Sequence, residues 1–239
     1  MSKRVLEFEG IRNFRDLGGY PTFDGKSIKW GIVYRSGGFS EATNEDLRKL
    51  SALRIRTVFD LRGAEDSLKQ PDRLPDKSGI RKIHLPMTTP AMYAWFQNWR
   101  LARRSDRSAI DGFILMTKIY KSMAEDCAAQ VKSVIDNLLD PDNIPAVFHC
   151  SAGKDRAGFV AAILLAALGV PYSEILKDYL LSNPSIDEWF RGLFDGHPNA
   201  SMLRKFVEAR AEFLEMAYQV LALNHGSIEA YIKNEIQTS

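Results

Sequence analysis

The chain has 239 residues, of which 45% are hydrophobic and 26% are charged, as in a globular protein with one large core. Its 32 Lys and Arg residues nearly balance 30 Asp and Glu residues, and this net charge of +2 argues against a protein that coats nucleic acid or a membrane. Two cysteines cannot build a disulfide framework, which excludes the small disulfide-rich class and favours a reducing compartment.

Neither export nor a membrane span is indicated. The acidic residues Glu7 and Glu9 interrupt the apolar stretch that a signal peptide needs. The longest apolar run, residues 159–168, is about half of the ~20 residues that cross a bilayer. We therefore expect a cytoplasmic protein with no integral membrane association, leaving open export without a signal peptide, and a single domain over residues 1–239.

The first half of the chain predicts strands that alternate with helices. Residues 13–20 are interpreted as a turn that packs the N-terminus, because Gly18 and Gly19 permit unusual backbone angles. A helix is predicted to begin near Thr43, whose hydroxyl can cap the first turn ahead of leucines at helical spacing. Short runs of β-branched, aromatic or apolar residues predict strands at 32–36, 57–61, 80–85 and 146–149.

Helices dominate the second half. Apolar residues recur every three or four positions over 113–139 and again over 203–221, and each pattern predicts one long amphipathic helix. Cys127 lies on the apolar stripe of the first and is expected in the core. Shorter helices are predicted at 173–181 and 228–232. Together these elements predict an α/β fold with a small, mostly parallel central sheet flanked by helices, and a helical C-terminal half.

One segment, residues 88–107, differs from its surroundings. Four aromatic residues precede four arginines; they are Tyr93, Trp95, Phe96 and Trp99, then Arg100, Arg103, Arg104 and Arg107. This pattern has two interpretations. In the first, the segment is a lid or an insertion that contacts a phosphate-rich ligand. In the second, it is an ordinary amphipathic helix with a solvated basic face.

The most informative segment is the loop that reads His-Cys-Ser-Ala-Gly-Lys-Asp-Arg over residues 149–156. It lies between an apolar strand and an apolar helix expected from Ala157, where unpaired backbone N–H groups and the helix dipole favour a phosphate. The same field favours the thiolate form of Cys150, which is the nucleophilic form. Arg156 follows six positions later and can return a planar guanidinium to two phosphate oxygens.

Other interpretations of the loop are weaker. A lone cysteine is often a small buried apolar residue, but a core cysteine gives no reason for the Gly, Lys, Asp and Arg that follow. An ATP-binding loop would need Gly at position 148, which is Phe, and Ser or Thr at 155, which is Asp. A zinc site is not indicated, because Cys127, His84, His197 and His225 are scattered along the chain.

These residues resemble the Cys-x5-Arg protein tyrosine phosphatase superfamily, and within it the atypical bacterial and fungal group whose signature is His-Cys-x-x-Gly-Lys-Asp-Arg. Further segments that look like this group lie along nearly the whole chain, at residues 13–20, 34–37, 57–62, 71–75 and 226–231. The resemblance implies a protein tyrosine phosphatase-like fold and a phosphomonoester hydrolase that needs no cofactor and no metal. It also implies a phosphorylated protein or phosphoinositide as substrate, and no nucleic-acid partner.

The resemblance implies a role for each loop residue. Cys150 is expected to form a phosphocysteine, and Arg156 to hold the phosphate. Asp155 is the candidate general acid, since the chain lacks the Trp-Pro-Asp sequence of conventional tyrosine phosphatases; the alternative is a helix-capping carboxylate. Asp60 is the second candidate acid, unless it forms an ion pair with Arg62 or Arg35. The remaining phosphate- or substrate-binding candidates are Ser151, Ala152, Gly153, Lys154 and Ala157.

Two loop residues bear on substrate range and turnover. Lys154 adds positive charge beyond the reacting phosphate, which favours phosphoserine and phosphoinositide substrates in addition to phosphotyrosine. Ala157 stands where many superfamily members have Ser or Thr, and its lack of a hydroxyl predicts slow turnover of the phosphoenzyme. Two other classes stay open: a catalytically degenerate phosphate-binding module and a rhodanese-like sulfur transferase. The oligomeric state has no signal in the sequence.

Overall fold

The computed structural model describes residues 4–75, 79–104 and 111–236. Within them, one sheet has the strand order β1-β2-β5-β3-β4, formed by β1 (Arg15–Asp16), β2 (Val33–Ser36), β3 (Thr57–Asp60), β4 (Arg81–His84) and β5 (Ala146–His149). β1 pairs with β2 in antiparallel fashion and the other pairs are parallel. The four strands predicted from the sequence are confirmed, each within one residue at either end.

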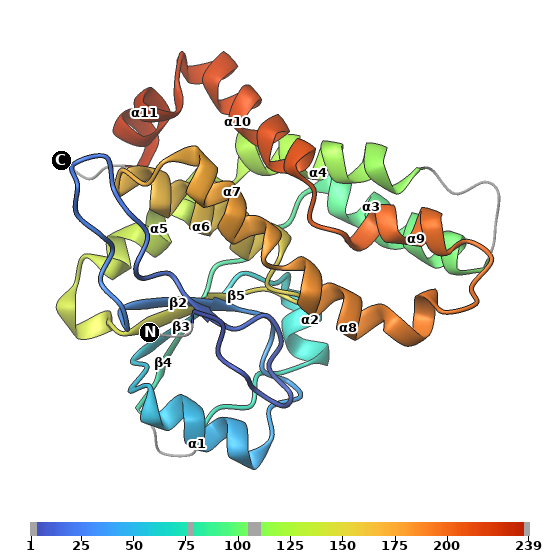
Figure 1. Ribbon diagram of the computed structural model, residues 1–239, viewed down its shortest axis with the longest axis horizontal. Coiled ribbons are helices and arrows are strands. Elements are labelled where there is room, and N and C mark those ends of the chain that lie inside the picture. Colours follow the sequence, from blue (N-terminus) through green and yellow to red (C-terminus); the bar gives the residue numbers. More distant parts are fainter. Residues whose placement is uncertain (1–3, 76–78, 105–110, 237–239) are drawn as a thin grey trace.

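Helices flank the sheet on both sides. Figure 1 shows α1 on one side of the sheet and α5, α6 and α7 on the other, with the C-terminal helices beyond them. The elements are α1 (Asn44–Ala52), α2 (Ala64–Lys69), α3 (Pro90–Arg103), α4 (Gly112–Asp126), α5 (Ala128–Leu138), the 3₁₀ helix η1 (Pro141–Asn143), α6 (Asp155–Ala167), α7 (Tyr172–Leu180), α8 (Asn183–Phe194), α9 (Ala200–Val207), α10 (Ala211–His225), α11 (Ile228–Tyr231) and the π-helical turn η2 (Ile232–Ile236). None of the described helices is long and apolar enough to cross a membrane.

The core lies on both faces of the sheet because side chains alternate along each strand. On β5, Phe148 belongs to the large cluster that α6 joins through Phe159, and Val147 packs on the other face with Leu50 of α1. The side chains of α6 are buried from Ala157 to Leu165, as expected for a helix that is apolar all round. Cys127 belongs to the same large cluster, so its prediction as a core residue is confirmed.

The predicted cap of α1 is confirmed, and Asp46, which takes part in it, also contacts the N-terminal segment. The Thr43 hydroxyl accepts a hydrogen bond from the Asp46 N–H at 3.2 Å, while the Asp46 carboxylate accepts from the Thr43 N–H at 3.0 Å. The same carboxylate accepts from the N–H groups of Glu9 at 2.8 Å and Gly10 at 2.7 Å. Asp46 thereby fastens the N-terminal segment to α1.

Both long helices predicted for the second half are broken, so these two predictions are wrong. The first divides at Cys127, whose ψ of 16° is not helical, into α4 and α5. The second stops at Val207 and resumes at Ala211, because the backbone of Ala209 leaves the helix to bond Asn183 through both its N–H (2.8 Å) and its carbonyl (2.9 Å). The apolar spacing continues across both breaks, so the sequence pattern does not indicate them.

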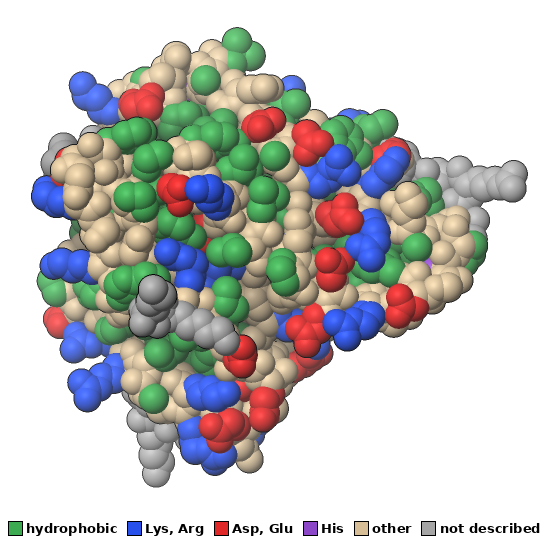
Figure 2. Space-filling model, in the orientation of Figure 1, with side chains coloured by type: hydrophobic (Ala, Val, Ile, Leu, Met, Phe, Trp, Pro, Cys, Tyr) green, Lys and Arg blue, Asp and Glu red, His purple; other side chains and the backbone are tan. Residues whose placement is uncertain are grey.

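The aromatic and arginine-rich segment forms α3, of which Arg107 lies outside the described residues. Trp95 and Trp99 stack 5.8 Å apart on its inner side, and Trp95 donates to the Phe206 carbonyl of α9 at 3.2 Å. Arg100, with Arg103 and Arg104, is exposed on the outer side. These contacts fit an amphipathic helix with a solvated basic face, and the lid or insertion stays a prediction. Figure 2 shows basic and acidic side chains interspersed over one face of the molecule, in line with its small net charge.

Candidate active site

The candidate nucleophile lies where the parallel strands end. Ser36, His149 and Asp60 occupy the same register at the carboxyl ends of β2, β5 and β3, and Cys150 follows His149 directly. The loop then leads into α6, which begins at Asp155, two residues before the start expected from the sequence. Figure 1 shows this connection beyond the end of β5, near α2 and α8. Cys150 is 2% exposed, whereas the neighbouring Ser151 is exposed.

Residues outside the loop hold the carbonyl groups of residues 151–154. The pairs are Ser151 O with Gly38 N (3.1 Å), Ala152 O with Asn13 Nδ2 (3.0 Å), and Gly153 O and Lys154 O with Arg35 Nη2 (2.8 and 3.1 Å). Each carbonyl shares a trans peptide with the N–H of the next residue, and the two point in opposite directions, so the N–H groups of 152–155 are directed to the other side. Within the described residues, none of the N–H groups of 151–154 has an acceptor. Such a row of unpaired donors at a helix start binds an anion.

A buried ion-pair network fixes these outside donors. Asp178 of α7 lies 2.6 Å from Arg35 and 3.0 Å from Arg15, and the Tyr20 hydroxyl donates to it at 2.9 Å. All three charged side chains are at most 1% exposed. Burial lowers the pKa of Arg35 to about 10, and Arg15 acts in the same direction. Burial would raise the pKa of Asp178, but the two arginines outweigh it and lower the pKa to about 2.

Gly153 is required by the turn of the loop. Its φ is +69°, in the region that residues with a Cβ rarely adopt. A Cβ at this position would lie 2.4 Å from the carbonyl carbon of Ser36 and 2.6 Å from the nitrogen of Gly37. The loop can therefore press against the end of β2 only with glycine here.

Arg156 reaches back across the loop. Its Nη2 donates to Ser151 Oγ at 3.0 Å and its Nη1 to the Leu61 carbonyl at 3.5 Å. The guanidinium thus lies between the first residues of the loop and the end of β3, on the side of the exposed Ser151. Ala157, one residue further, is fully buried, and Ala152 packs against the apolar cluster of α3, α8 and α9.

Asp155 contacts side chains rather than the helix backbone. Tyr120 Oη donates to its Oδ1 at 2.9 Å, and Lys154 Nζ lies 3.3 Å from the same oxygen. The residue at the cap of α6 is Lys154, and no side chain caps the first turn. The capping interpretation of Asp155 is therefore not supported, and its side chain stays 27% exposed.

Lys154 is directed away from the exposed part of the loop. It is 2% exposed, and its Nζ donates to the carbonyls of Val207 at 2.6 Å and Glu208 at 3.2 Å. These carbonyls end α9, where the helix dipole attracts a cation. The ammonium group therefore joins the loop of residues 149–156 to α9.

Asp60 forms an ion pair, which was its alternative interpretation. Arg62 donates to both of its carboxylate oxygens, at 2.9 and 2.8 Å, and the Ser67 hydroxyl donates at 2.7 Å. Burial would raise the pKa of Asp60, but these hydrogen bonds outweigh it and hold the pKa well below its usual range. A fully buried carboxylate that stays ionised is a poor proton donor, and the candidate acid is left as Asp155.

One buried cluster has the composition of a metal site. Oxygens of Asp60 and Asp72 and a ring nitrogen of His149 lie within 4.8 Å of one another. However, Arg62 and Lys82 each contact both carboxylates at 2.7–3.2 Å, and a divalent cation would face both positive charges. His149 contacts Asp72 at 3.2 Å and thereby anchors the start of the loop.

Comparison with known proteins identifies the family of this chain. The model of the tyrosine phosphatase family matches residues 6–239. The chain belongs to the tyrosine phosphatase family. It is 29% identical to a Cupriavidus necator protein named "Putative tyrosine-protein phosphatase", over 97% of this chain and 84% of that one. It is 27% identical to the triple specificity protein phosphatase PtpB of Mycobacterium tuberculosis, over 96% and 93%. The crystal structure of Pseudomonas aeruginosa TpbA matches 80% of this chain and 89% of its own at 20% identity and a TM-score of 0.37.

In this tyrosine phosphatase family member, sequence reasoning missed most of the residues that support the loop. Asn13, Arg15 and Arg35 lie in the segments that carry the family resemblance, and that resemblance was the available signal. Asp178 and Tyr120 have no signal, because each looks like an ordinary residue of an amphipathic helix. Their contacts depend on packing between segments that are far apart in the chain.

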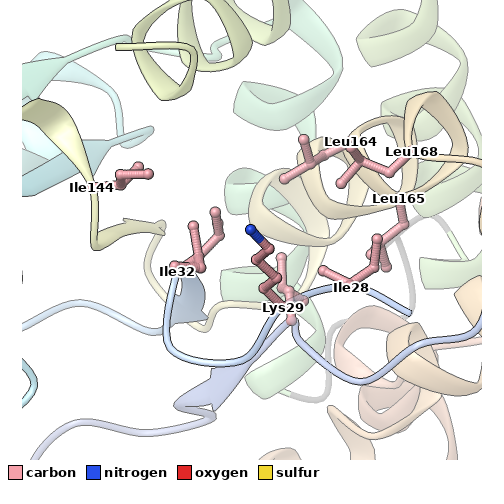
Figure 3. Close-up of a pocket in the computed structure, with 9 residues that line it drawn as sticks. Ile28, Lys29, Ile32, Ile144, Leu164, Leu165 and Leu168 are labelled. Atoms are coloured by element: carbon pink, nitrogen blue, oxygen red, sulfur yellow. The ribbon is translucent and has the colours of Figure 1, made fainter. Parts of the chain in front are cut away.

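The phosphatase also contains an apolar cavity of about 220 Å³, at the far end of the same strand and helix (Figure 3). Ile144 precedes β5, and Leu164, Leu165 and Leu168 lie at the end of α6, whereas Cys150 lies between β5 and α6. Figure 3 shows the Lys29 nitrogen pointing into the space between Ile32 and the leucines. This cavity is thus separate from the loop of residues 149–156.

Proposed function

We propose that the chain is a phosphomonoester hydrolase that acts on phosphotyrosine through a phosphocysteine intermediate. The observation that carries the proposal is the loop geometry. Outward-held carbonyls leave a row of N–H groups, with no acceptor in the described part of the chain, between Cys150 and the guanidinium of Arg156. This arrangement suits a dianionic phosphate, and its donors strengthen as charge develops on the phosphoryl oxygens.

The reaction has two steps. The Cys150 sulfur attacks phosphorus as the bond from phosphorus to the leaving oxygen breaks, and Asp155 gives that oxygen its proton. The Asp155 carboxylate then takes a proton from water, whose oxygen attacks phosphorus and releases the Cys150 thiolate. Arg156 and the amides of 151–154 hold the phosphoryl oxygens throughout. No metal or cofactor takes part.

The test is hydrolysis of p-nitrophenyl phosphate by reduced protein. We expect turnover by wild type and none by Cys150→Ser, with unchanged thermal unfolding, because the thiol is buried and the hydroxyl is similar in size. An inactive, well-folded wild type that binds phosphate would instead identify a phosphate-binding module. Turnover of thiosulfate, without phosphatase activity, would identify a sulfur transferase.

We propose further that phosphoserine and phosphoinositides are also substrates. Two observations support this wider range: the buried ammonium of Lys154 adds positive charge behind the loop without reaching its exposed part, and a relative at 27% identity is named a triple specificity protein phosphatase. Wild type should release phosphate from phosphoinositide vesicles, and Lys154→Ala should lose that activity more than its activity on phosphotyrosine peptides. An unchanged ratio of the two activities counts against a role for Lys154 in substrate choice.

A further inference from the structure

The candidate acid receives both of its donors on one carboxylate oxygen. Tyr120 Oη donates to Asp155 Oδ1 at 2.9 Å, and Lys154 Nζ is 3.3 Å from the same atom. Within the described residues Oδ2 has no partner. A proton on this carboxyl group therefore occupies Oδ2, because Oδ1 already faces two donors.

A second tyrosine holds the first. Tyr179 of α7 places its hydroxyl oxygen 2.8 Å from that of Tyr120 in α4. Tyr120 directs its single proton to Asp155, so Tyr179 is the donor of this bond. The two side chains are at most 1% exposed, and burial raises the pKa of both phenols. Both remain neutral hydrogen-bond donors at physiological pH.

We propose that Tyr120, supported by Tyr179, is a positioning residue that fixes the rotation of the Asp155 carboxyl group. This inference rests on the proposed phosphatase activity. As the bond between Cys150 sulfur and phosphorus forms and the bond to the leaving oxygen breaks, the proton on Oδ2 passes to that oxygen. Tyr120 does not touch the substrate and keeps its own proton. It excludes Oδ1 from the transfer and leaves Oδ2, in a side chain that is 27% exposed, to make it.

Substitution of these buried tyrosines by phenylalanine can separate the positioning role from a role in packing. Tyr120 and Tyr179 belong to the core behind α6, and their ring centroids are 6.0 Å apart. Phenylalanine keeps each ring and the apolar contacts and removes only the hydroxyl. The fold can therefore persist while the carboxyl group loses one of the two contacts that fix its rotation.

The test compares two leaving groups in Tyr120→Phe and Tyr179→Phe. Phenolate is a poor leaving group and needs the acid, whereas p-nitrophenolate is stable without it. We expect kcat on phenyl phosphate to fall about ten- to hundredfold in Tyr120→Phe and less in Tyr179→Phe, at unchanged KM. On p-nitrophenyl phosphate, kcat should fall less than about threefold.

Tyr218→Phe is the matched control. It removes a tyrosine hydroxyl from the same helical layer, one that donates to the Ala162 carbonyl at 3.2 Å and does not contact Asp155. It should leave both activities unchanged. Equal losses on both substrates in Tyr120→Phe, or a similar selective loss in Tyr218→Phe, overturn the positioning role. Unchanged phenyl phosphate turnover in Tyr120→Phe overturns that role alone, whereas a wild type inactive on both substrates overturns the proposed function as well.

Discussion

Replacing Asp178 with Asn tests whether the buried ion-pair network holds the loop of residues 149–156. The substitution keeps the shape of the side chain but leaves Arg15 and Arg35 buried without a counter-charge. In the wild type, these two side chains lie 3.0 and 2.6 Å from the Asp178 carboxylate oxygens. Removing one partner of a buried pair costs about 3–5 kcal/mol. Because Asn still accepts hydrogen bonds, we expect a loss of about 3 kcal/mol in the free energy of unfolding.

The assay is urea unfolding at pH 7, with Asp187→Asn as the matched control. Asp187 pairs with Arg204 at 2.7 Å, but the two side chains are 54% and 41% exposed. This exposed pair should contribute less than about 1 kcal/mol. Phosphatase activity of folded Asp178→Asn should also fall, because Arg35 donates to two loop carbonyls. Equal, small losses of stability in both variants would refute this account of the loop.

The pH dependence provides an independent check. The folded pKa of Asp178, about 2, lies below the value of about 3.9 for an unfolded chain. The unfolded state therefore binds the proton first as the pH falls, and the stabilising charge is fully effective only above about pH 4. The stability difference between wild type and Asp178→Asn should shrink as the pH falls from about 4 to about 2. A difference that stays constant over this range would contradict the assignment.

Two further predictions concern the loop itself. Gly153→Ala should abolish phosphatase activity in a folded protein, because a Cβ there would lie 2.4 Å from the backbone of Ser36; activity within about tenfold of wild type would count against this constraint. Ala157→Thr should give a smaller pre-steady-state burst of p-nitrophenol than wild type, because a hydroxyl at this position can stabilise the departing thiolate. Equal bursts in both proteins would mean that Ala157 does not slow turnover.

The parts of the fold that could be predicted depend on local sequence. The strands follow from short β-branched and apolar runs, and the cap of α1 follows from the hydroxyl of Thr43. The breaks at Cys127 and at 208–210 could not be predicted, because apolar spacing continues across them. The second break depends on Asn183, which is 26 residues away from Ala209 in the chain.

The same difference between local sequence and distant contacts applies to the site. Cys150, Arg156 and Gly153 stand in one short segment, so their grouping was visible in the sequence. The donors that hold its carbonyls were not, since Asn13 and Arg35 reach it from 139 and 118 residues away. Asp178 joins them from α7, where it looks like any polar residue of an amphipathic helix.

The position of Lys154 changes what its substitution can measure. Its Nζ contacts the carbonyls that end α9 and also Asp155 Oδ1, so Lys154→Ala removes a helix contact, a neighbour of the candidate acid and a positive charge together. Loss of the first two should lower activity on every phosphomonoester, because both act on loop geometry. Loss of the charge alone should act on substrates that carry further phosphates. The ratio of the two activities, rather than either one alone, therefore decides whether this lysine sets substrate range.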